Sequence, residues 1–450
     1  MEVDAVAGAA KRKFDEAGDD DGAAGAKGRR VEASGGAGGS AMVKSFDITD
    51  MKFSEGLLRI YYDKFFPYEK MFDWLSYFND PTSDDPAVRR DFFSLREWSF
   101  TIGEAYIRFL TFHTLAEFKA GIQSKQPHKI DIGAVYSTQA SKHNTVKKDA
   151  FKPVQRELVF DIDLTDYDDV RTCCSGATIC NKCWQYMNVA IKVLDVGLRE
   201  DFGFKNILFI YSGRRGVHCW VCDESARTLS NHERTAVVDY FSAVSGGSDH
   251  GSKTAAVTSP LVPCFERAFA ELEAFFTEWV ITKKGQGILE SDEHWGKVLD
   301  MVPDLSGLHD KVERAFKTAE SARERWEKLK DIVHKRLGKL TRADWREAKV
   351  LEKLIAEIVF VFCYPRIDEA VTKGMNHLLK SPFCVHPKTG RVCVAIDPAE
   401  ADTFDPFAVP TIGALAKELN SGASVERTSL AAYIDIFDRK FLRGLRADVT

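Results

Sequence analysis

The sequence predicts a mixed α/β fold, in which a core of β-sheets flanked by helices is interrupted by an inserted helical segment. Three observations support this prediction. Between residues 93 and 224, short stretches alternate apolar and polar residues, as half-buried strands do. From about 225 to 360, apolar residues recur every three or four positions, which is the spacing of amphipathic helices. Alternation returns at 383–396, so we expect the core to resume after the insertion.

Composition limits the classes of partner. The chain has 450 residues and a formal net charge of −5, so a nucleic-acid partner needs a local basic groove. No apolar run reaches the roughly 18 residues that span a membrane, and the N-terminus lacks the pattern of a secretory signal. We therefore expect no membrane partner. We also expect the ten cysteines to be thiols or metal ligands rather than disulfides.

The N-terminal stretch is mostly glycine, alanine and charged residues. It cannot bury enough apolar surface to offset the entropy of ordering, so we predict a disordered arm over residues 1–45. The basic clusters KRKFD at 11–15 and KGRR at 27–30 have the composition of nuclear import signals or of loose nucleic-acid contacts. A solvated tail explains them about equally well.

Local signals place the individual elements. Ser54 can cap a helix over 54–77, and Thr341 and Asp344 have the spacing of a capping box. An amphipathic helix is expected at 429–445. The strands are expected within 93–112, 129–137, 158–164, 204–224 and 383–396, and the last two ranges are predicted hairpins.

The stretch ELVFDIDLTDYDDV at 157–170 places two acids in an apolar strand. Alternate residues of a strand point to the same face, so Asp161 and Asp163 share one, with Cα atoms about 6.6 Å apart. The two carboxylates repel each other, and one or two divalent cations would offset that repulsion. An exposed acidic turn is the alternative. If the metal hypothesis holds, we expect Asp163→Ala to abolish activity without lowering the melting temperature.

Asp368, in YPRIDEAV, is a candidate third carboxylate for such a site. Taken alone, it is better explained as the cap of the helix that begins after it, because Glu369, Ala370 and Val371 can form a first turn.

The turn in YSGRRGVHCW, at 211–220, is a candidate phosphate site. Gly213 and Gly216 let the backbone approach a ligand closely, and paired guanidinium groups suit phosphate oxygens. A hairpin turn that is basic by chance is the alternative. The candidate ligands are Ser212, Arg214, Arg215 and His218, and Lys380 and His386 form a second basic pair.

Four cysteines within eleven residues predict a structural zinc site. Four thiolates complete a tetrahedral Zn²⁺ shell and leave no open position for catalysis. Cys219 and Cys222 can replace one pair of these ligands, although their alternation on a strand explains them without metal. The favoured ligands are Cys173, Cys174, Cys180 and Cys183.

Three motifs in the same order resemble those of one family. ELVFDIDLTDYDDVR with the cysteine cluster, YSGRRGVHCWVCDE, and HLLKSPFCVHPKTGR resemble the small catalytic subunit of eukaryotic DNA primases, within the archaeal and eukaryotic primase family, over about residues 50–440. The resemblance implies a primase-type catalytic core and DNA-templated synthesis of short RNA primers from ribonucleoside triphosphates by two-metal nucleotidyl transfer.

The resemblance also implies a role for each matching residue. Asp161, Asp163 and Asp368 would hold two Mg²⁺ or Mn²⁺ ions, and the four cysteines would hold Zn²⁺. Ser212, Arg214, Arg215, His218, Lys380 and His386 would bind the triphosphate, while Glu97, Arg108 and Asp131 would line the nucleotide pocket. The chain departs from the family pattern at Trp98, where phenylalanine is expected.

The same resemblance implies partners and a division of the chain. The partners would be a primase large subunit, the catalytic and accessory subunits of DNA polymerase alpha, single-stranded DNA template and ribonucleoside triphosphates, in the nucleus. The expected parts are the arm 1–45, a first part of the catalytic core 46–240 with the zinc motif at 173–183, a helical subdomain 241–360, and a second part of the core with a C-terminal helix 361–450.

Two other function classes fit some of these features. A metal-dependent glycosyltransferase also uses paired aspartates, but it needs no basic groove for a template. A zinc-stabilised nucleic-acid-binding protein without catalysis explains the cysteines and arginines, but it leaves the paired acids without a role, because they would repel a phosphate backbone. A requirement for Mg²⁺ or Mn²⁺ in nucleotide binding separates the binding module from the primase.

Overall fold

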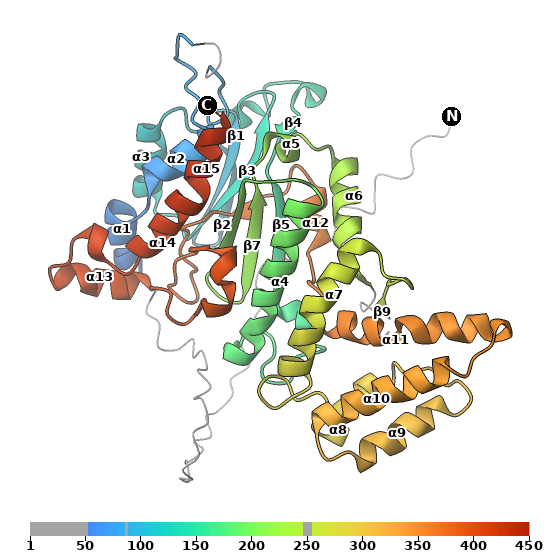
Figure 1. Ribbon diagram of the computed structural model, residues 1–450. Helices are drawn as coiled ribbons and strands as arrows, with labels where there is room; N and C mark the ends of the chain where they lie inside the picture. The colour runs from blue at the N-terminus through green and yellow to red at the C-terminus, as the bar shows by residue number, and fades with distance from the viewer. Residues whose placement is uncertain (1–52, 86–88, 246–253, 450) are drawn as a thin grey trace. The chain divides into compact units, whose positions relative to one another are not determined.

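The computed structural model describes residues 53–85, 89–245 and 254–449 (Figure 1). The predicted disordered arm, with its basic clusters at 11–15 and 27–30, lies outside these residues. Within them the fold combines many helices with antiparallel sheets, which confirms the predicted mixed α/β class. None of the helices in these ranges is long and apolar enough to span a membrane.

Two antiparallel sheets form the core. The first has the order β10 (Leu379–Lys380), β3 (Lys129–Tyr136), β1 (Arg96–Ile102) and β2 (Ala105–Leu110), and β4 (Pro153–Gln155) also pairs with β3. The second has the order β11 (Ala395–Ile396), β6 (Ile207–Tyr211), β7 (Gly216–Val221) and β5 (Leu158–Asp163). A small third sheet pairs β8 (Val244–Ser245) with β9 (Thr254–Ala255). The strands predicted within 93–112, 129–137, 158–164 and 204–224 are therefore confirmed.

Helices cover these sheets, and a further set of helices forms the inserted segment of the chain. Those of the first half are α1 (Glu55–Lys64), α2 (Tyr68–Ser76), α3 (Leu115–Lys125), α4 (Asn181–Glu200), α5 (Glu224–Arg227) and α6 (Asn231–Phe241). Those of the inserted segment are α7 (Pro263–Phe275), α8 (Asp292–Leu299), α9 (Leu308–Thr318), α10 (Ala322–Leu337) and α11 (Trp345–Cys363). The remainder are α12 (Glu369–Lys373), α13 (Ile412–Asn420), α14 (Ala431–Ile436) and α15 (Arg443–Val449).

The predicted helix caps are present. The Ser54 hydroxyl accepts a hydrogen bond from the backbone N–H of Leu57 at the start of α1. Thr341 and Asp344 form the predicted capping box, on a short 3₁₀ turn that leads directly into α11. These side chains satisfy N–H groups that the first turn of a helix leaves without a backbone partner.

Three elements differ from the prediction. The helix expected over 54–77 is divided into α1 and α2, because the chain breaks before Pro67, which precedes α2. The hairpin expected at 383–396 is present but short: it pairs at Val385 and Val392, with backbone hydrogen bonds from His386 to Arg391 and from Cys393 to Cys384. The residues after it leave the hairpin and pair with β6 as strand β11. The helix expected at 429–445 is present, but a π-helical turn at Phe437–Leu442 separates α14 from α15. Phe437 and Phe441 of this turn both pack edge-on against Trp74 of α2.

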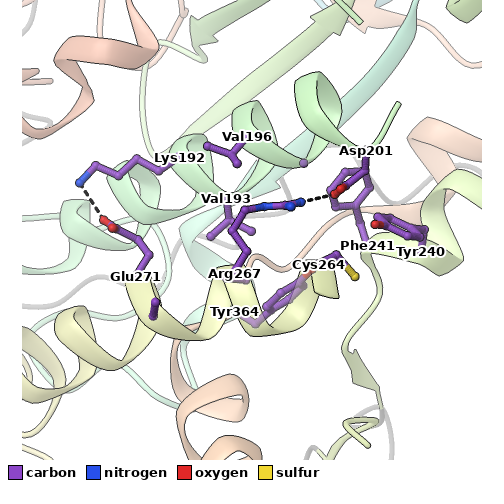
Figure 2. Close-up of a pocket in the computed structure, with 13 residues that line it drawn as sticks. Lys192, Val193, Val196, Asp201, Tyr240, Phe241, Cys264, Arg267, Glu271 and Tyr364 are labelled. Atoms are coloured by element: carbon purple, nitrogen blue, oxygen red, sulfur yellow. Dashed lines mark hydrogen bonds and ion pairs between the residues drawn. The ribbon is translucent and has the colours of Figure 1, made fainter. Parts of the chain in front are cut away.

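Charged side chains fasten the inserted helices to the core. Figure 2 shows α4 and α7 side by side, with Lys192 Nζ 2.9 Å from Glu271 Oε1 and Arg267 paired with Asp201. Between these two ion pairs lies a cavity of about 420 Å³. Its apolar lining includes Val193, Val196, Phe241 and Tyr364. Ion pairs on either side of a partly filled apolar space thus join α7 to α4.

A buried ion pair joins the two main sheets. Arg96 of β1 donates hydrogen bonds of 2.9 Å to each carboxylate oxygen of Glu157, which directly precedes β5, and both side chains are completely buried. The Tyr77 hydroxyl donates a further hydrogen bond to the same carboxylate. Burial alone raises the pKa of Glu157, but the charge and hydrogen bonds of Arg96 outweigh it and lower the pKa to about 2.

This ion pair predicts an acid-sensitive component of stability. The pKa of Glu157 is lower in the folded than in the unfolded chain, so its contribution is complete above the unfolded value near 4.5 and is lost as the pH falls toward 2. At neutral pH, Glu157→Gln should cost roughly 3–5 kcal/mol of unfolding free energy, because it leaves the Arg96 charge buried without a partner. Urea denaturation at several pH values would measure both effects.

The matched control for this prediction is the double substitution Arg96→Met with Glu157→Leu. It removes both charges together and should be less destabilising than Glu157→Gln alone. The difference in stability between wild type and Glu157→Gln should also shrink as the pH falls from about 4.5 toward 2, because Glu157 is then protonated in the unfolded chain before it is protonated in the folded one. A difference that stays constant from pH 7 to pH 3 would contradict the proposed origin of the low pKa.

Candidate active site

Strand β5 presents Asp161 and Asp163 on one face at its end. In the antiparallel register with β7, Asp161 lies opposite His218 and Asp163 opposite Gly216. The two aspartate side chains are 30% and 32% exposed, whereas Ile162 between them is buried. The two carboxylates thus share a face, as the period of a strand predicts.

Asp161 lacks a cationic partner of its own. Among the described residues it makes no ion pair with lysine or arginine, and its nearest basic group is His218 Nε2, at 3.6 Å. Burial, followed by the charges of Lys380 and Lys129, lowers the pKa of His218 to about 3, so that the ring is neutral. Burial and the neighbouring carboxylates of Asp163 and Asp368 raise the pKa of Asp161 to about 7.

Asp163 is better satisfied than its neighbour. Its carboxylate accepts hydrogen bonds from the backbone N–H of Thr165 at 2.8 Å and from the Thr165 hydroxyl at 2.9 Å. The Arg215 Nε also donates to it, at 2.8 Å from either carboxylate oxygen. The arginine predicted to bind phosphate is therefore paired with a predicted metal ligand.

Asp368 comes to the same place from the end of the helical insertion. Its backbone N–H donates a hydrogen bond of 3.0 Å to the carbonyl oxygen of Asp161, and its side chain accepts one from the backbone N–H of Ala370. The predicted capping role is confirmed, and it coexists with a position beside the paired acids. A cavity of about 550 Å³ opens at Asp368, with Arg366, Phe241 and Ser242 also in its lining.

The acids fit hard divalent cations by their chemistry. Carboxylate oxygens are the preferred protein ligands of such ions. A bound cation would also stabilise the ionised form of Asp161, which makes no ion pair with a described lysine or arginine. A compact metal site needs at least three acidic, histidine or cysteine side chains with ligand atoms close together. Among the described residues, only two groups have such atoms within 4.8 Å of one another: the cysteine cluster, and His309 with Asp310 and Glu313. The three aspartates do not form such a compact set, so ligands other than these side chains must complete any coordination.

The turn between β6 and β7 is packed against the segment that follows α12. Gly213 has a φ of +89°, and a Cβ built there would lie 2.7 Å from the His386 Cβ. The Thr389 hydroxyl donates to the Gly213 carbonyl at 2.7 Å, and Lys380 Nζ lies 3.4 Å from the Ser212 carbonyl oxygen. Glycine is therefore required at 213 both for the backbone conformation and for the close approach.

This packing brings most of the predicted phosphate ligands together. The Ser212 hydroxyl accepts a hydrogen bond from the Gly216 N–H across the turn. Burial, and then the charges of Lys380, Arg214 and Arg215, lower the pKa of His386 well below its ordinary value. The concentration of positive charge that depresses this pKa is the same feature that attracts an anion.

The third predicted group lies on the first sheet. Arg108 of β2 forms a two-point ion pair with Glu97 of β1, with distances of 2.9 and 3.2 Å. Asp131 of β3 lies 3.3 Å from Lys129 Nζ and pairs in register with Lys380 of β10. Because Lys380 also reaches the Ser212 carbonyl, the first sheet connects to the turn of the second.

The four clustered cysteines converge. Their sulfur atoms all lie within 4.8 Å of one another, and the Cys180 and Cys183 sulfurs are 3.9 Å apart. A tetrahedral Zn²⁺ with ~2.3 Å bonds places its sulfurs roughly 3.8 Å apart, so the set fits zinc. Hydrogen bonds from the Cys173 and Cys183 thiols, and from backbone N–H groups at the start of α4, lower the pKa of Cys180. Cys219 and Cys222 are buried but do not belong to this cluster. The Cys222 sulfur instead accepts a hydrogen bond from the Trp74 indole.

Comparison with known proteins identifies the family. The model of the DNA primase small subunit family matches residues 160–398. A DNA primase small subunit of Drosophila melanogaster is 41% identical over 373 residues, which are 82% of this chain and 82% of the fly protein. The chain belongs to the DNA primase small subunit family. The resemblance predicted from the three motifs is thereby confirmed.

More distant relatives extend the comparison beyond animals. A DNA primase small subunit of Saccharomyces cerevisiae is 35% identical over 384 residues, 84% of this chain and 89% of the yeast protein. A DNA primase small subunit PriS of Haloarcula marismortui is 27% identical over 334 residues, 70% of this chain and 78% of the archaeal protein. The family match at 160–398 spans the three aspartates, the basic turn and the cysteines, while Glu97, Arg108 and Asp131 lie before it.

Arg366 is a site residue of this primase family member that sequence reasoning missed. Its guanidinium donates to Asp169 and to the backbone carbonyl of Asp166, and it lies 5.0 Å from the centre of the Tyr167 ring. It thereby ties the segment that carries Asp368 to the acidic loop after β5. The only signal in the sequence was its position two residues before Asp368, because the acidic loop that it binds lies about 200 positions earlier in the chain.

The cysteine geometry predicts one bound zinc ion per chain. Cys180→Ser should remove that ion and lower the melting temperature by several degrees, because the site closes the loop that leads into α4. Metal content from atomic emission and a thermal melt would measure both effects. Cys219→Ser is the matched control and should keep the zinc, since that thiol is buried on β7. Zinc retained by Cys180→Ser but lost from Cys219→Ser would reverse the assignment.

Proposed function

We propose that this chain is the catalytic subunit of a primase, which synthesises short RNA primers on single-stranded DNA during replication. It acts as a nucleotidyltransferase, and more specifically as a DNA-directed RNA polymerase that uses ribonucleoside triphosphates. The single observation that carries the proposal is the uncompensated Asp161 carboxylate, set between Asp163 and Asp368 and beside a basic turn. Family membership supports the same activity.

Asp161, Asp163 and Asp368 would hold two Mg²⁺ or Mn²⁺ ions. When bound, such ions lower the pKa of the attacking 3′-hydroxyl and neutralise charge on the leaving pyrophosphate. The chain's own contribution is to hold three acids of the same sign in one place. It does so through the β5–β7 register and through the backbone hydrogen bond from Asp368 to Asp161.

The basic turn would bind the triphosphate of the incoming nucleotide. Ser212 and Lys380 meet at its base, and His386 lies against Gly213. Arg214 and Arg215 would supply the charge-assisted hydrogen bonds that suit phosphate oxygens. His218 is neutral, so it would bind through its ring N–H rather than through charge. Glu97, Arg108 and Asp131 would contact the nucleoside from the first sheet.

Arg215 has a second role before the nucleotide binds. It pairs with Asp163, so it reduces the repulsion between the acids while no metal is present. Binding of a cation at Asp163 would release the guanidinium toward the phosphates. Charge balance at the site is thus maintained in both states.

A primase small subunit works with a large subunit and a DNA template. We propose in addition that the assembly includes the catalytic and accessory subunits of DNA polymerase alpha and acts in the nucleus. The basic clusters at 11–15 and 27–30, which lie outside the described residues, would serve nuclear import. The four cysteines would hold a structural Zn²⁺. The glycosyltransferase alternative has no support in the family membership.

Substitution of the paired acids tests the function and separates the two side chains. Asp161→Asn should reduce primer synthesis by about 100-fold or more and leave the melting temperature unchanged or higher, because it removes a charge for which burial and the neighbouring carboxylates outweigh the attraction of Lys380. The assay is RNA synthesis on a single-stranded homopolymer with the matching nucleoside triphosphate and Mn²⁺, with and without the large subunit.

Asp163→Ala is the companion variant. It should abolish synthesis as well. The sequence alone predicts no fall in the melting temperature, but the structure predicts that the melting temperature will fall. The structure explains the change, because this carboxylate caps the turn at Thr165 and pairs with Arg215. The lost cap should cost about 1–2 kcal/mol. Full activity in both folded variants would overturn the proposed catalytic role.

A further inference from the structure

The turn between α10 and α11 carries an exposed tryptophan surrounded by cations. Trp345 is the first residue of α11 and is 53% exposed. The Arg346 guanidinium lies 5.3 Å from the centre of its ring and Lys349 Nζ lies 5.5 Å from it. Both cations make cation–π contacts over the indole, about half of whose surface is still exposed, so aromatic surface and positive charge occur together at this turn.

The charges near this tryptophan are largely unbalanced. Residues 335–353 contain seven basic and three acidic residues, in a chain whose net charge is −5. Two of these acids already have partners, because Glu347 pairs with Arg336 and Asp344 caps the turn at Thr341. Four exposed cations make no ion pair with any described residue. Together with Trp345 they form what we call the Trp345 surface: Lys339, Arg342, Arg346 and Lys349.

Helix α11 connects this surface to the acids of the candidate active site. The helix runs from Trp345 to Cys363 without interruption, and Asp368 follows five residues later. In Figure 1 it passes from the α10–α11 turn back toward β9 and α7. Nineteen residues at 1.5 Å each span about 28 Å, which equals roughly eight stacked nucleotides at 3.4 Å per nucleotide.

We propose that the Trp345 surface binds single-stranded template DNA at a distance from the reacting nucleotides. A base would stack on the Trp345 ring, and Arg342, Arg346 and Lys349 would neutralise phosphates on either side. This inference rests on the proposed primase function. An exposed aromatic ring among unpaired cations is the combination that binds single strands without sequence preference.

A protein partner is less well matched to this surface. Stable protein interfaces have an apolar centre that is depleted in charge. Among the described residues of the turn and of the first two turns of α11, the only exposed large apolar side chains are those of Trp345 and Val350. The cations would have to be neutralised by an acidic partner. A nucleic-acid strand supplies both the negative charge and the stacking face.

Template length separates this surface from the active site. Strands of about 6 nucleotides are too short to reach both, whereas strands of about 20 nucleotides can. With the full chain and its large subunit, Trp345→Ala should weaken binding of the long strand by at least about 5-fold in fluorescence anisotropy. Primer synthesis on the short strand should be unchanged, because that reaction does not require the strand to reach the Trp345 surface. Trp345→Phe keeps an aromatic face and should retain most of the affinity.

The cations give an independent measurement. Arg346→Gln with Lys349→Gln removes two phosphate contacts, so the slope of log affinity against log salt should fall by about 1.4 for the long strand. The matched control is Lys125→Gln with Lys417→Gln, which removes the same charge from two exposed positions on α3 and α13 and should leave the slope unchanged. Strands extended on the 3′ or on the 5′ side will show which end of the template passes the surface.

Two results would overturn the proposal. If Trp345→Ala binds the long strand as the wild type does, then the surface does not bind template. If that variant instead loses the large subunit in size-exclusion chromatography, the surface is a protein interface. These results can be distinguished from failure of the proposed primase function. If that function is wrong, the wild type itself will show no primer synthesis on the short strand.

Discussion

The crowding of acids at the end of β5 is the constraint on which the rest of the site depends. Asp161 faces a neutral histidine, and its pKa rises to about 7 because burial and two more carboxylates oppose its charge. Such an arrangement is costly in a protein that binds no cation. The surrounding structure holds it through contacts distant in sequence, above all the hydrogen bond from Asp368 to the Asp161 carbonyl.

Those contacts explain why the core is built in two parts. The third acid can reach β5 only because α11 brings the chain back from the inserted helices, and Lys380 then pairs with β3 while it reaches the turn after β6. The buried Arg96–Glu157 pair fixes the first sheet to the start of β5. The basic turn between β6 and β7, the three acids and the predicted nucleotide-pocket residues of the first sheet are therefore held by one network across both sheets.

The same network reaches the cysteine cluster. Arg366 holds the acidic loop after β5 through Asp169, and Arg171 holds the next turn through Asp168 and the carbonyl oxygens of Gly176 and Thr178. A zinc ion at the cysteines would therefore stabilise a loop that begins where the paired acids end. A metal ion bound there would act on the three acids only indirectly, through this loop.

Sequence alone determined the features that depend on local spacing. The period of a strand placed Asp161 and Asp163 on one face, the cysteine spacing predicted a four-thiolate site, and the motifs identified the family. Only the tertiary structure decided that Arg215 pairs with Asp163, that His218 is neutral, and that Arg366 binds the acidic loop. These depend on burial and on contacts between residues up to about 200 positions apart, and neither can be read from periodicity, because periodicity specifies which face a side chain occupies but not what that face meets.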